Sequence, residues 1–186
     1  MTRLILASNS PRRKELLSDL GYSFEIIPSN INEEIDLNNS IQNEIEKLSF
    51  NKALSVFKDN KDAIVIGSDS VVILNNKIYG KPKNKEEAKL MLQALRNKTH
   101  VVLTAVTIIS NKQSETFSEN AEVTFDNISD EEIDKYINEE NVLDKAGAYA
   151  IQGLAKKFIK SINGDYFTIM GLPVHELYVR LKKYYE

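Results

Sequence analysis

The chain contains no cysteine. This absence excludes disulfide bonds, thiolate metal sites and cysteine nucleophiles together, and it fits a reducing compartment. The sequence also lacks any apolar run that approaches the ~20 residues needed to cross a bilayer. The few apolar residues before Ser8 are too short for the core of a signal peptide. We therefore expect a soluble protein of the cytoplasm.

An excess of basic residues is missing as well. The 24 Lys and Arg are outnumbered by 27 Asp and Glu, for a net charge of −3. Such a chain is a poor candidate for binding long nucleic acid, because that affinity comes largely from neutralising many phosphates. A local cluster of cations could still bind one small polyphosphate. The two histidines, His100 and His175, have apolar or amphipathic neighbours and no metal-binding spacing, so we expect structural roles for them.

What the sequence does contain is a mixed α/β pattern in 186 residues, of which 42% are hydrophobic. We expect one domain over residues 1–186, with two lobes whose boundary the sequence does not mark. Apolar runs and helical periodicity predict the elements. Strands are expected at 4–6, 24–27, 63–67, 71–74, 101–109 and 121–125, and helices after Ser10, over 41–57, after Asn84, after Ser129, at 158–159 and over 172–184.

The segment Ser8 to Arg13 leads from a strand through a polar turn into a helix, with Ser10 as N-cap and Pro11 at the first helical position. The first N–H groups of a helix lack internal partners and attract anions. Arg12 and Arg13 are unfavourable in a first turn unless an anion is bound. The alternative is a solvated turn with ordinary surface arginines. We favour phosphate binding, although the glycine-rich pattern of a P-loop is absent.

Asp69 interrupts an apolar run that extends from Ile64 to Leu74. A buried carboxylate without a partner is costly, so a general base or Mg²⁺ ligand at a strand end is one interpretation. Ser68-Asp69-Ser70 also has the composition of a turn, which would place Asp69 at an exposed tip. The residues alone leave these two interpretations equally supported.

Three further charged residues, Glu33, Lys52 and Lys81, would ordinarily be surface side chains, although Lys81 lies between Gly80 and Pro82. The small residues between Asp144 and Gly153 would let a ligand approach the backbone closely. A packed turn is the simpler interpretation of that stretch.

In order along the chain, these segments resemble the Maf family over nearly the whole length. The resemblance is carried by six ordered blocks, which together are far more specific than any one alone. They are Leu4 to Leu17 with Ser10-Pro11-Arg12-Arg13, Phe50-Asn51-Lys52-Ala53, Ser68-Asp69-Ser70-Val71-Val72, Gly80-Lys81-Pro82, Gly147 to Gly153, and Gly164-Asp165-Tyr166 through Gly171-Leu172-Pro173.

The resemblance implies a mixed, twisted sheet flanked by helices, two lobes around a central cleft, and a fold similar to that of the inosine triphosphate pyrophosphatases. It also implies hydrolysis of a nucleoside triphosphate to the monophosphate and pyrophosphate, with a divalent cation (Mg²⁺ or Mn²⁺), and allows a homodimer. Carried over residue by residue, it makes Asp69 the proton acceptor and Arg12, Ser70 and Gln152 the positions linked to substrate choice. Other polar positions of the cleft are Ser8, Arg13, Glu33, Lys52 and Lys81. Chemistry then suggests Glu33 and Asp69 as metal ligands, and Ser8, Arg12, Arg13, Lys52 and Lys81 as phosphate-binding groups.

Ser70 and Ile151-Gln152-Gly153 resemble the branch of the family that prefers dTTP and UTP, whereas the branch that prefers 7-methyl-GTP has Glu at the position of Gln152. A Gln amide offers a donor and an acceptor to the edge of uracil or thymine, although the same amide flipped would suit cytosine. We expect a dTTP/UTP pyrophosphatase that removes unwanted or modified nucleotides and takes part in cell-division arrest. The alternatives are a pyrophosphatase with another base preference, such as 7-methyl-GTP, and a nucleotide-binding regulator of septum formation with little catalysis. Three departures from the family pattern are Ser70 in place of Thr, Ala150 in place of Gly and Val142 in place of Trp.

Overall fold

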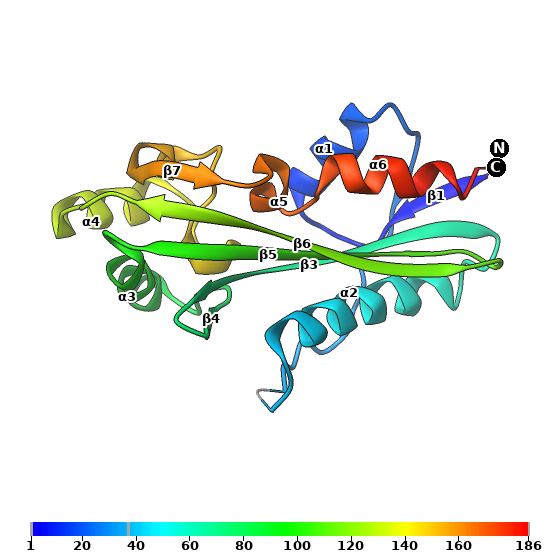
Figure 1. Cartoon of the computed structure of the whole chain (residues 1–186), viewed down its shortest axis with the longest axis horizontal. Coiled ribbons are helices and arrows are strands. Elements are labelled where there is room, and N and C mark those ends of the chain that lie inside the picture. The colour runs from blue at the N-terminus through cyan, green and yellow to red at the C-terminus, as the bar shows by residue number, and fades with distance from the viewer. Residues whose placement is uncertain (1, 37, 186) are drawn as a thin grey trace. The chain divides into compact units, whose positions relative to one another are not determined.

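A computed structural model describes residues 2–36 and 38–185 of the chain. Strands and helices alternate along it (Figure 1). The elements in order are β1 (Arg3–Leu6), α1 (Pro11–Asp19), β2 (Glu25–Ile26), α2 (Ile41–Phe57), β3 (Ala63–Leu74), β4 (Lys77–Tyr79), α3 (Lys85–Leu95), β5 (Thr99–Ile109), β6 (Ser114–Phe125), α4 (Asp130–Glu139), the 3₁₀ helices η1 (Ala146–Ala148) and η2 (Leu154–Phe158), β7 (Ile159–Asn163), α5 (Tyr166–Met170) and α6 (Val174–Lys182).

The strands form one mixed sheet in the order β2-β1-β3-β5-β6-β7, with β4 beside β3. Strand β1 is parallel to both β2 and β3, whereas β4 is antiparallel to β3 and β7 is antiparallel to β6. A parallel pair needs a crossover connection, and here α1 joins β1 to β2. The mixed sheet with flanking helices confirms the predicted α/β class.

The chain divides into two compact units. Unit 1 comprises Met1–Ser70, Thr104–Glu119 and Gly171–Glu186, and unit 2 comprises Val71–Leu103 and Asn120–Met170. The long strands β3, β5 and β6 contribute residues to both units. Each unit has its own hydrophobic cluster. This is expected, because the hydrophobic faces of a sheet must be buried against helices or other elements.

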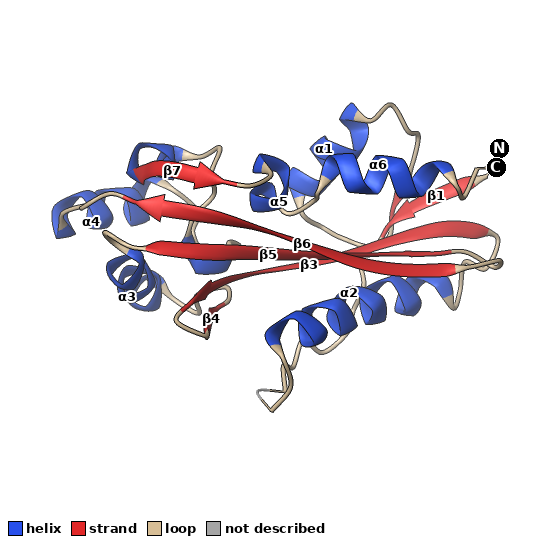
Figure 2. Cartoon of the chain, in the orientation of Figure 1, coloured by secondary structure: helices blue, strands red, loops and turns tan. Residues whose placement is uncertain are grey.

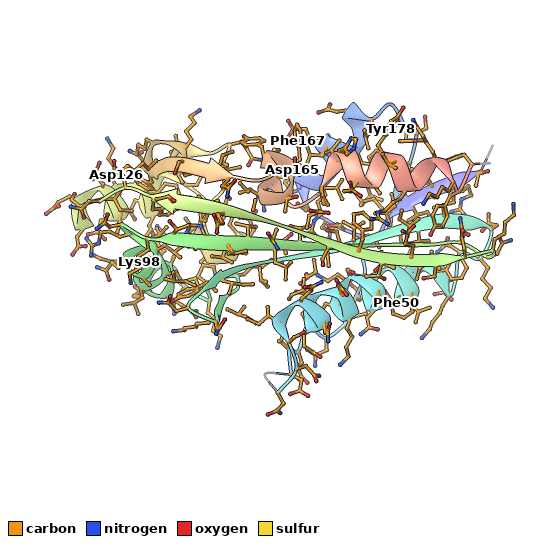
Figure 3. The ribbon with its side chains drawn as sticks, in the orientation of Figure 1. Phe50, Lys98, Asp126, Asp165, Phe167 and Tyr178 are labelled. Carbon is orange, nitrogen blue, oxygen red and sulfur yellow. The ribbon has the colours of Figure 1, made fainter. Side chains whose placement is uncertain are left out.

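In unit 1, helix α2 covers one face of the strands, and α1 and α6 cover the other (Figure 1). Fully buried residues on the α2 side include Ile5 on β1, Val65 on β3 and Ala53 on α2. Phe50, labelled in Figure 3, packs against this cluster from α2. Burial of such side chains contributes about 25 cal/mol per Å² of apolar surface, which holds α2 against the strands.

The helix starts follow the capping rules. The side chain of Ser10 accepts a hydrogen bond from the backbone N–H of Arg13, and Asn84 caps α3 in the same way. Ser129 and Glu132 form a complete capping box at the start of α4. These bonds satisfy backbone N–H groups that have no partner inside the helix. The predicted starts of all three helices are confirmed.

Two expectations for secondary structure were wrong. Ser68-Asp69-Ser70 does not interrupt a strand: β3 runs unbroken over Ala63–Leu74, as Figure 2 shows. The polar triplet fits a strand because each of its side chains finds a buried polar partner there. The expected helix at Phe158-Ile159 is absent: Phe158 ends the short 3₁₀ helix η2, and Ile159 begins the strand β7. The short hairpin strand β4, after a turn at Asn75-Asn76, was not predicted.

Among the described residues, the structure has no helix that combines the length and the hydropathy needed to span a membrane.

The core of unit 2 contains a buried histidine among aromatic rings. His100 is 1% exposed, and its ring meets those of Phe125 and Tyr149 edge-on at centroid distances of 5.0 and 5.4 Å. Its Nε2 lies 2.7 Å from the Tyr149 hydroxyl, while Nδ1 has no hydrogen-bond partner within the described parts of the chain. Burial lowers the pKa of His100 from its usual 6.5 to about 4.

This pKa makes the stability of the protein pH-dependent. The unfolded chain protonates His100 below about pH 6.5, but the folded protein does so only near pH 4, so stability falls as pH drops through that window. Between pH 7 and pH 5 the loss from this residue is about 2 kcal/mol. We expect His100→Gln to lose that much less stability than the wild type over the same range, measured by urea unfolding. His175→Gln, at an exposed position, is the matched control, and an acid sensitivity unchanged in His100→Gln would contradict the prediction.

Candidate active site

Strand β3 presents its polar residues to two different faces of the sheet. Side chains alternate along a strand, so Gly67 and Asp69 face one side, and Ser68 and Ser70 face the other. The first side is that of α2, and Asp69 is 8% exposed there. The interpretation of Asp69 as an exposed turn tip is therefore wrong: its carboxylate is buried in a strand.

Gly67 allows α2 to lie unusually close to β3. A Cβ added to Gly67 would lie 2.6 Å from the backbone nitrogen of Ala53 and even closer to the carbonyl oxygen of Ser49. Real Cβ atoms do not approach other heavy atoms so closely, so only glycine fits here. Ser49, Lys52 and Ala53 are spaced i, i+3 and i+4 and share one helix face. The same close approach therefore places Lys52 over Asp69.

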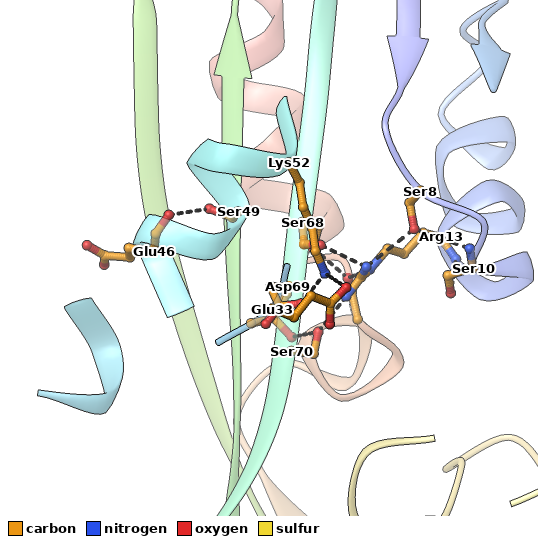
Figure 4. Close-up of polar contacts among 12 residues, drawn as sticks. Ser8, Ser10, Arg13, Glu33, Glu46, Ser49, Lys52, Ser68, Asp69 and Ser70 are labelled. Carbon is orange, nitrogen blue, oxygen red and sulfur yellow. Dashed lines mark hydrogen bonds and ion pairs between the residues drawn. The ribbon is translucent and has the colours of Figure 1, made fainter. Parts of the chain in front are cut away.

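Lys52 holds two carboxylates at once. Its ammonium lies 2.5 Å from Asp69 Oδ1 and 2.8 Å from Glu33 Oε1 (Figure 4). The side chains of Lys52 and Asp69 are 8% and 11% exposed, whereas that of Glu33 is 48% exposed. Removal of a single partner from such a buried pair leaves an uncompensated charge, which costs about 3–5 kcal/mol. The structure thus brings together three residues that were predicted from separate parts of the sequence.

On the other face of β3, Arg13 makes a set of hydrogen bonds to the protein. Its Nε donates to the carbonyl oxygen of Gly171 at 2.8 Å, and Nη1 donates to that of Ser68 at 2.8 Å. Nη1 also donates to Ser8 Oγ at 3.4 Å, and Nη2 donates to Ser70 Oγ at 3.0 Å (Figure 4). Burial lowers the pKa of Arg13, an effect that the charge of Asp69 opposes.

The turn between β1 and α1 brings polar groups to the carboxyl end of β1. β1 pairs in parallel with β3 as far as Leu6, which lies opposite Ile66, so the residues that follow β1 lie near the part of β3 after Ile66. Ser8 Oγ accepts from the backbone N–H of Ser10 at 3.2 Å. Arg12 is in the first turn of α1, and its side chain makes no hydrogen bond or ion pair with the residues the structure describes. This edge of a parallel pair beside a helix N-terminus is where α/β proteins bind anions.

Lys81 and Gln152 belong to unit 2. Lys81 is exposed in the loop between β4 and α3, and the neighbouring Gly80 carbonyl accepts a 3.0 Å hydrogen bond from the N–H of Gly147. Gln152 lies in a turn closed by a bond from the Gly153 N–H to the Ala150 carbonyl, and its Oε1 is buried without a partner in the described portion. The loops that carry the two residues are thus tied together within this unit.

Four residues of this site had no predicted role: Gly67, Ser68, Thr104 and Gly171. Thr104 Oγ1 lies 2.8 Å from Ser70 Oγ, and Gly171 accepts hydrogen bonds from both Arg13 and Ser68. Gly171 also has a φ of 107°, which side chains rarely adopt. The one available signal was the alternation of side chains along a strand, which places residues 67 and 69 on one face of β3 and residues 68 and 70 on the other.

The donor set around Asp69 fits a cation only in part. No group of three or more His, Cys, Asp or Glu side chains with the geometry of a metal site occurs among the described residues. Two carboxylates do converge on one position, that of the Lys52 ammonium. Oxygen ligands of this kind suit Mg²⁺, which usually takes one or two carboxylates and completes its shell with phosphate oxygens and water.

The chain is similar to known proteins over nearly its whole length. The family model described as Maf-like protein matches residues 3–184. A protein of Bacillus pumilus named dTTP/UTP pyrophosphatase is 49% identical over 94% of this chain and 92% of its own length. Proteins with the same name from Bacillus cereus and Bacillus anthracis are 46% and 47% identical, each over 99% of this chain and 96% of its own length. One crystal structure, of a protein from Vibrio cholerae, is 12% identical with a TM-score of 0.41 over 63% of this chain and 61% of that one, a likeness too weak to bear on the fold.

The contact at Gly67 generates a prediction about stability. We expect Gly67→Ala to destabilise the protein by about 2–3 kcal/mol, because the new methyl group overlaps the backbone of α2 and the helix must move away. The midpoint of urea unfolding, with the slope unchanged, measures this effect. Gly80→Ala is the control, since no atom lies within 4 Å of its added Cβ. Equal stability of the two variants would show that α2 yields without cost.

Proposed function

The chain belongs to the Maf family, and we propose that it hydrolyses dTTP and UTP between the α- and β-phosphates, releasing the nucleoside monophosphate and pyrophosphate. The observation that carries the proposal is the cluster of Asp69, Glu33 and Lys52 beside the arginines of α1. A carboxylate base next to several cations is what attack of water on a polyphosphate requires. The names of the relatives from Bacillus support the choice of dTTP and UTP.

Asp69 is the proposed general base. Its described hydrogen bond engages Oδ1 with Lys52, and Oδ2 makes none with any residue the structure describes, so Oδ2 is the oxygen that accepts the proton of the attacking water. The ion pair with Lys52 orients the carboxylate. A positioned base of this kind contributes about 10²–10⁴-fold to the rate.

The cations would stabilise the charge that develops on the departing pyrophosphate. In this proposal, Arg12, Lys52 and Lys81 contact phosphate oxygens, together with the Ser8 hydroxyl and the N-terminus of α1. Arg13 contributes its positive charge at the same place. Preorganised charge is usually the largest single contribution to such a reaction, and loss of one donor can cost about 10²–10³ in rate.

A divalent cation, Mg²⁺ or Mn²⁺, is the proposed cofactor. Glu33 and Asp69 would hold it, since both carboxylates reach one position and are otherwise balanced by Lys52. When bound, it would lower the pKa of water and neutralise phosphate charge. Lys52 would then also be able to donate to the phosphates, because the cation would share the negative charge of the two carboxylates with it.

Base selection is assigned to Arg12, Ser70 and Gln152. The Oε1 of Gln152, buried without a described partner, would accept from the N3–H of uracil or thymine, and its Nε2 would donate to O4. Ser70 acts through its neighbours, since its hydroxyl bonds Arg13 and Thr104. Because its substrates are nucleoside triphosphates, we propose that the enzyme works in the cytoplasm. We also expect a homodimer.

The reaction is tested with the purified protein, Mg²⁺ and a panel of nucleoside triphosphates in ¹⁸O-labelled water. We expect dTTP and UTP to be converted fastest, with ¹⁸O in the monophosphate, because water attacks the α-phosphorus. Asp69→Asn should lower kcat by about 10²–10⁴-fold, whereas Asp59→Asn, at an exposed position of the same unit, should not change it. Label in the pyrophosphate, or full activity of Asp69→Asn, would refute the mechanism.

Specificity is tested by Gln152→Glu. The carboxylate removes the donor to O4 and places a negative charge against a carbonyl, so kcat/KM for dTTP and UTP should fall at least about tenfold, as for loss of a buried hydrogen bond. Gln113→Glu makes the same chemical change in an exposed turn and should have no effect. If Gln152→Glu retained the wild-type preference, another residue would select the base.

A further inference from the structure

The N–H groups of Arg13 are almost fully engaged by the protein itself. A guanidinium carries five N–H donors. Four of them have acceptors among the described residues: the carbonyl oxygens of Gly171 and Ser68 and the hydroxyls of Ser8 and Ser70. The distances to the two carbonyl oxygens, both 2.8 Å, are those of strong bonds from a charged donor. At most one N–H of Arg13 is left for a phosphate.

The acceptors of Arg13 lie on both sides of Asp69 in the sequence. Nη1 bonds the carbonyl of Ser68, one residue before Asp69, and Nη2 bonds the hydroxyl of Ser70, one residue after it. The side chains of Ser68 and Ser70 point away from α2, whereas the Asp69 side chain points towards it. Arg13 therefore bonds β3 on both sides of Asp69 and, at Ser70, on the face opposite to the carboxylate.

Arg13 also bonds an acceptor outside β3, the carbonyl oxygen of Gly171. The carbonyl of Gly171 accepts from Arg13 Nε at 2.8 Å and from Ser68 Oγ at 3.1 Å. The positive φ of Gly171 aims that carbonyl at the pair, and a Cβ there would lie 3.4 Å from both Arg13 Nε and Ser70 Oγ. The guanidinium of Arg13 thus connects three segments of unit 1, at residues 8–13, 68–70 and 171.

Arg12 has the opposite environment, although it is in the same turn of α1. Its side chain makes no hydrogen bond or ion pair with any described residue, and its positive charge adds to the effect of burial in lowering the pKa of Arg13. Two adjacent arginines at a helix N-terminus therefore differ in one property that matters for an anion: the number of N–H groups they can offer.

We propose that Arg13 is a positioning residue for Asp69 and that Arg12, not Arg13, contacts the phosphates. Arg13 holds β3 at Ser68 and Ser70 and so fixes the direction in which the Asp69 carboxylate points. This inference rests on the proposed function for the identity of the reaction, but the contacts of Arg13 are properties of the protein without substrate.

The first test follows the side-chain N–H groups of the five arginines by NMR of ¹⁵N-arginine-labelled wild-type protein. The Nε–H of Arg13 should exchange slowly with water in the free protein, because it is bonded to the Gly171 carbonyl. Addition of pyrophosphate with Mg²⁺ should slow exchange at Arg12 at least about tenfold and change that at Arg13 less than about twofold. Fast exchange at Arg13 in the free protein, or protection of Arg13 by pyrophosphate, would overturn the proposal.

The second test compares conservative variants of the two residues. A lysine keeps the charge and binds phosphate as a point charge, but it cannot reach acceptors arranged for a fork. Arg13→Lys should lower kcat at least about tenfold while the Kd for pyrophosphate, measured by calorimetry, stays within about threefold. Arg12→Ala should weaken pyrophosphate binding at least about tenfold, and Arg12→Lys should restore part of it. Thermal unfolding of each variant confirms that the folded protein is compared.

Wild-type kcat in Arg13→Lys would show that Arg13 does not position Asp69. A loss of pyrophosphate affinity in it equal to that in Arg12→Ala would show that Arg13 is an ordinary phosphate ligand. If the wild type turned over no nucleotide, the proposed function would fail. The exchange of the Arg13 Nε–H in the free protein would still decide its structural part, since that measurement needs neither turnover nor ligand. The exchange experiment uses no variant, so it also stands if Arg13→Lys does not fold.

Discussion

The close contact between α2 and β3 at Gly67 is the constraint on which the rest of the site depends. Without a side chain at Gly67, the backbone of the helix reaches the strand, and Lys52 comes within 2.5 Å of Asp69. A methyl group would push the helix outwards by an amount that the short ion pair could not absorb. The pairing of the two charges, and the position where they meet Glu33, both follow from that one backbone contact.

The same strand serves two purposes because its side chains alternate. One face carries Asp69 towards Lys52, and the other carries Ser68 and Ser70 towards Arg13. Lys52 therefore bonds the carboxylate of Asp69 itself, while Arg13 bonds the residues on either side of it. A carboxylate held in this way has little freedom to reorient, and restricted motion of this kind is what a reacting group requires.

Such an arrangement is unfavourable for stability taken alone. Burying Lys52, Asp69 and Arg13 removes each charge from water, and the attraction between them repays that cost only with good geometry. The apolar cluster of unit 1 around Ile5, Val65 and Ala53 supplies stabilisation that offsets the cost of burying these charges. A polar cluster maintained at such a cost points to function more strongly than to structure.

By itself, the sequence determined the local features of this protein. Helix starts at Ser10, Asn84 and Ser129 were predictable because a cap depends on residues within one turn. The membership of Asp69, Glu33 and Lys52 in one site came only from the resemblance to a family. Local composition assigned Glu33 and Lys52 to the surface, and it left Asp69 equally between an exposed turn and a functional position at a strand end. Only the tertiary structure decided that Asp69 is buried within a strand, that a glycine allows Lys52 to reach it, and that adjacent Arg12 and Arg13 have different surroundings. These are contacts between residues far apart in the chain, and no local pattern encodes which backbone will lie against which.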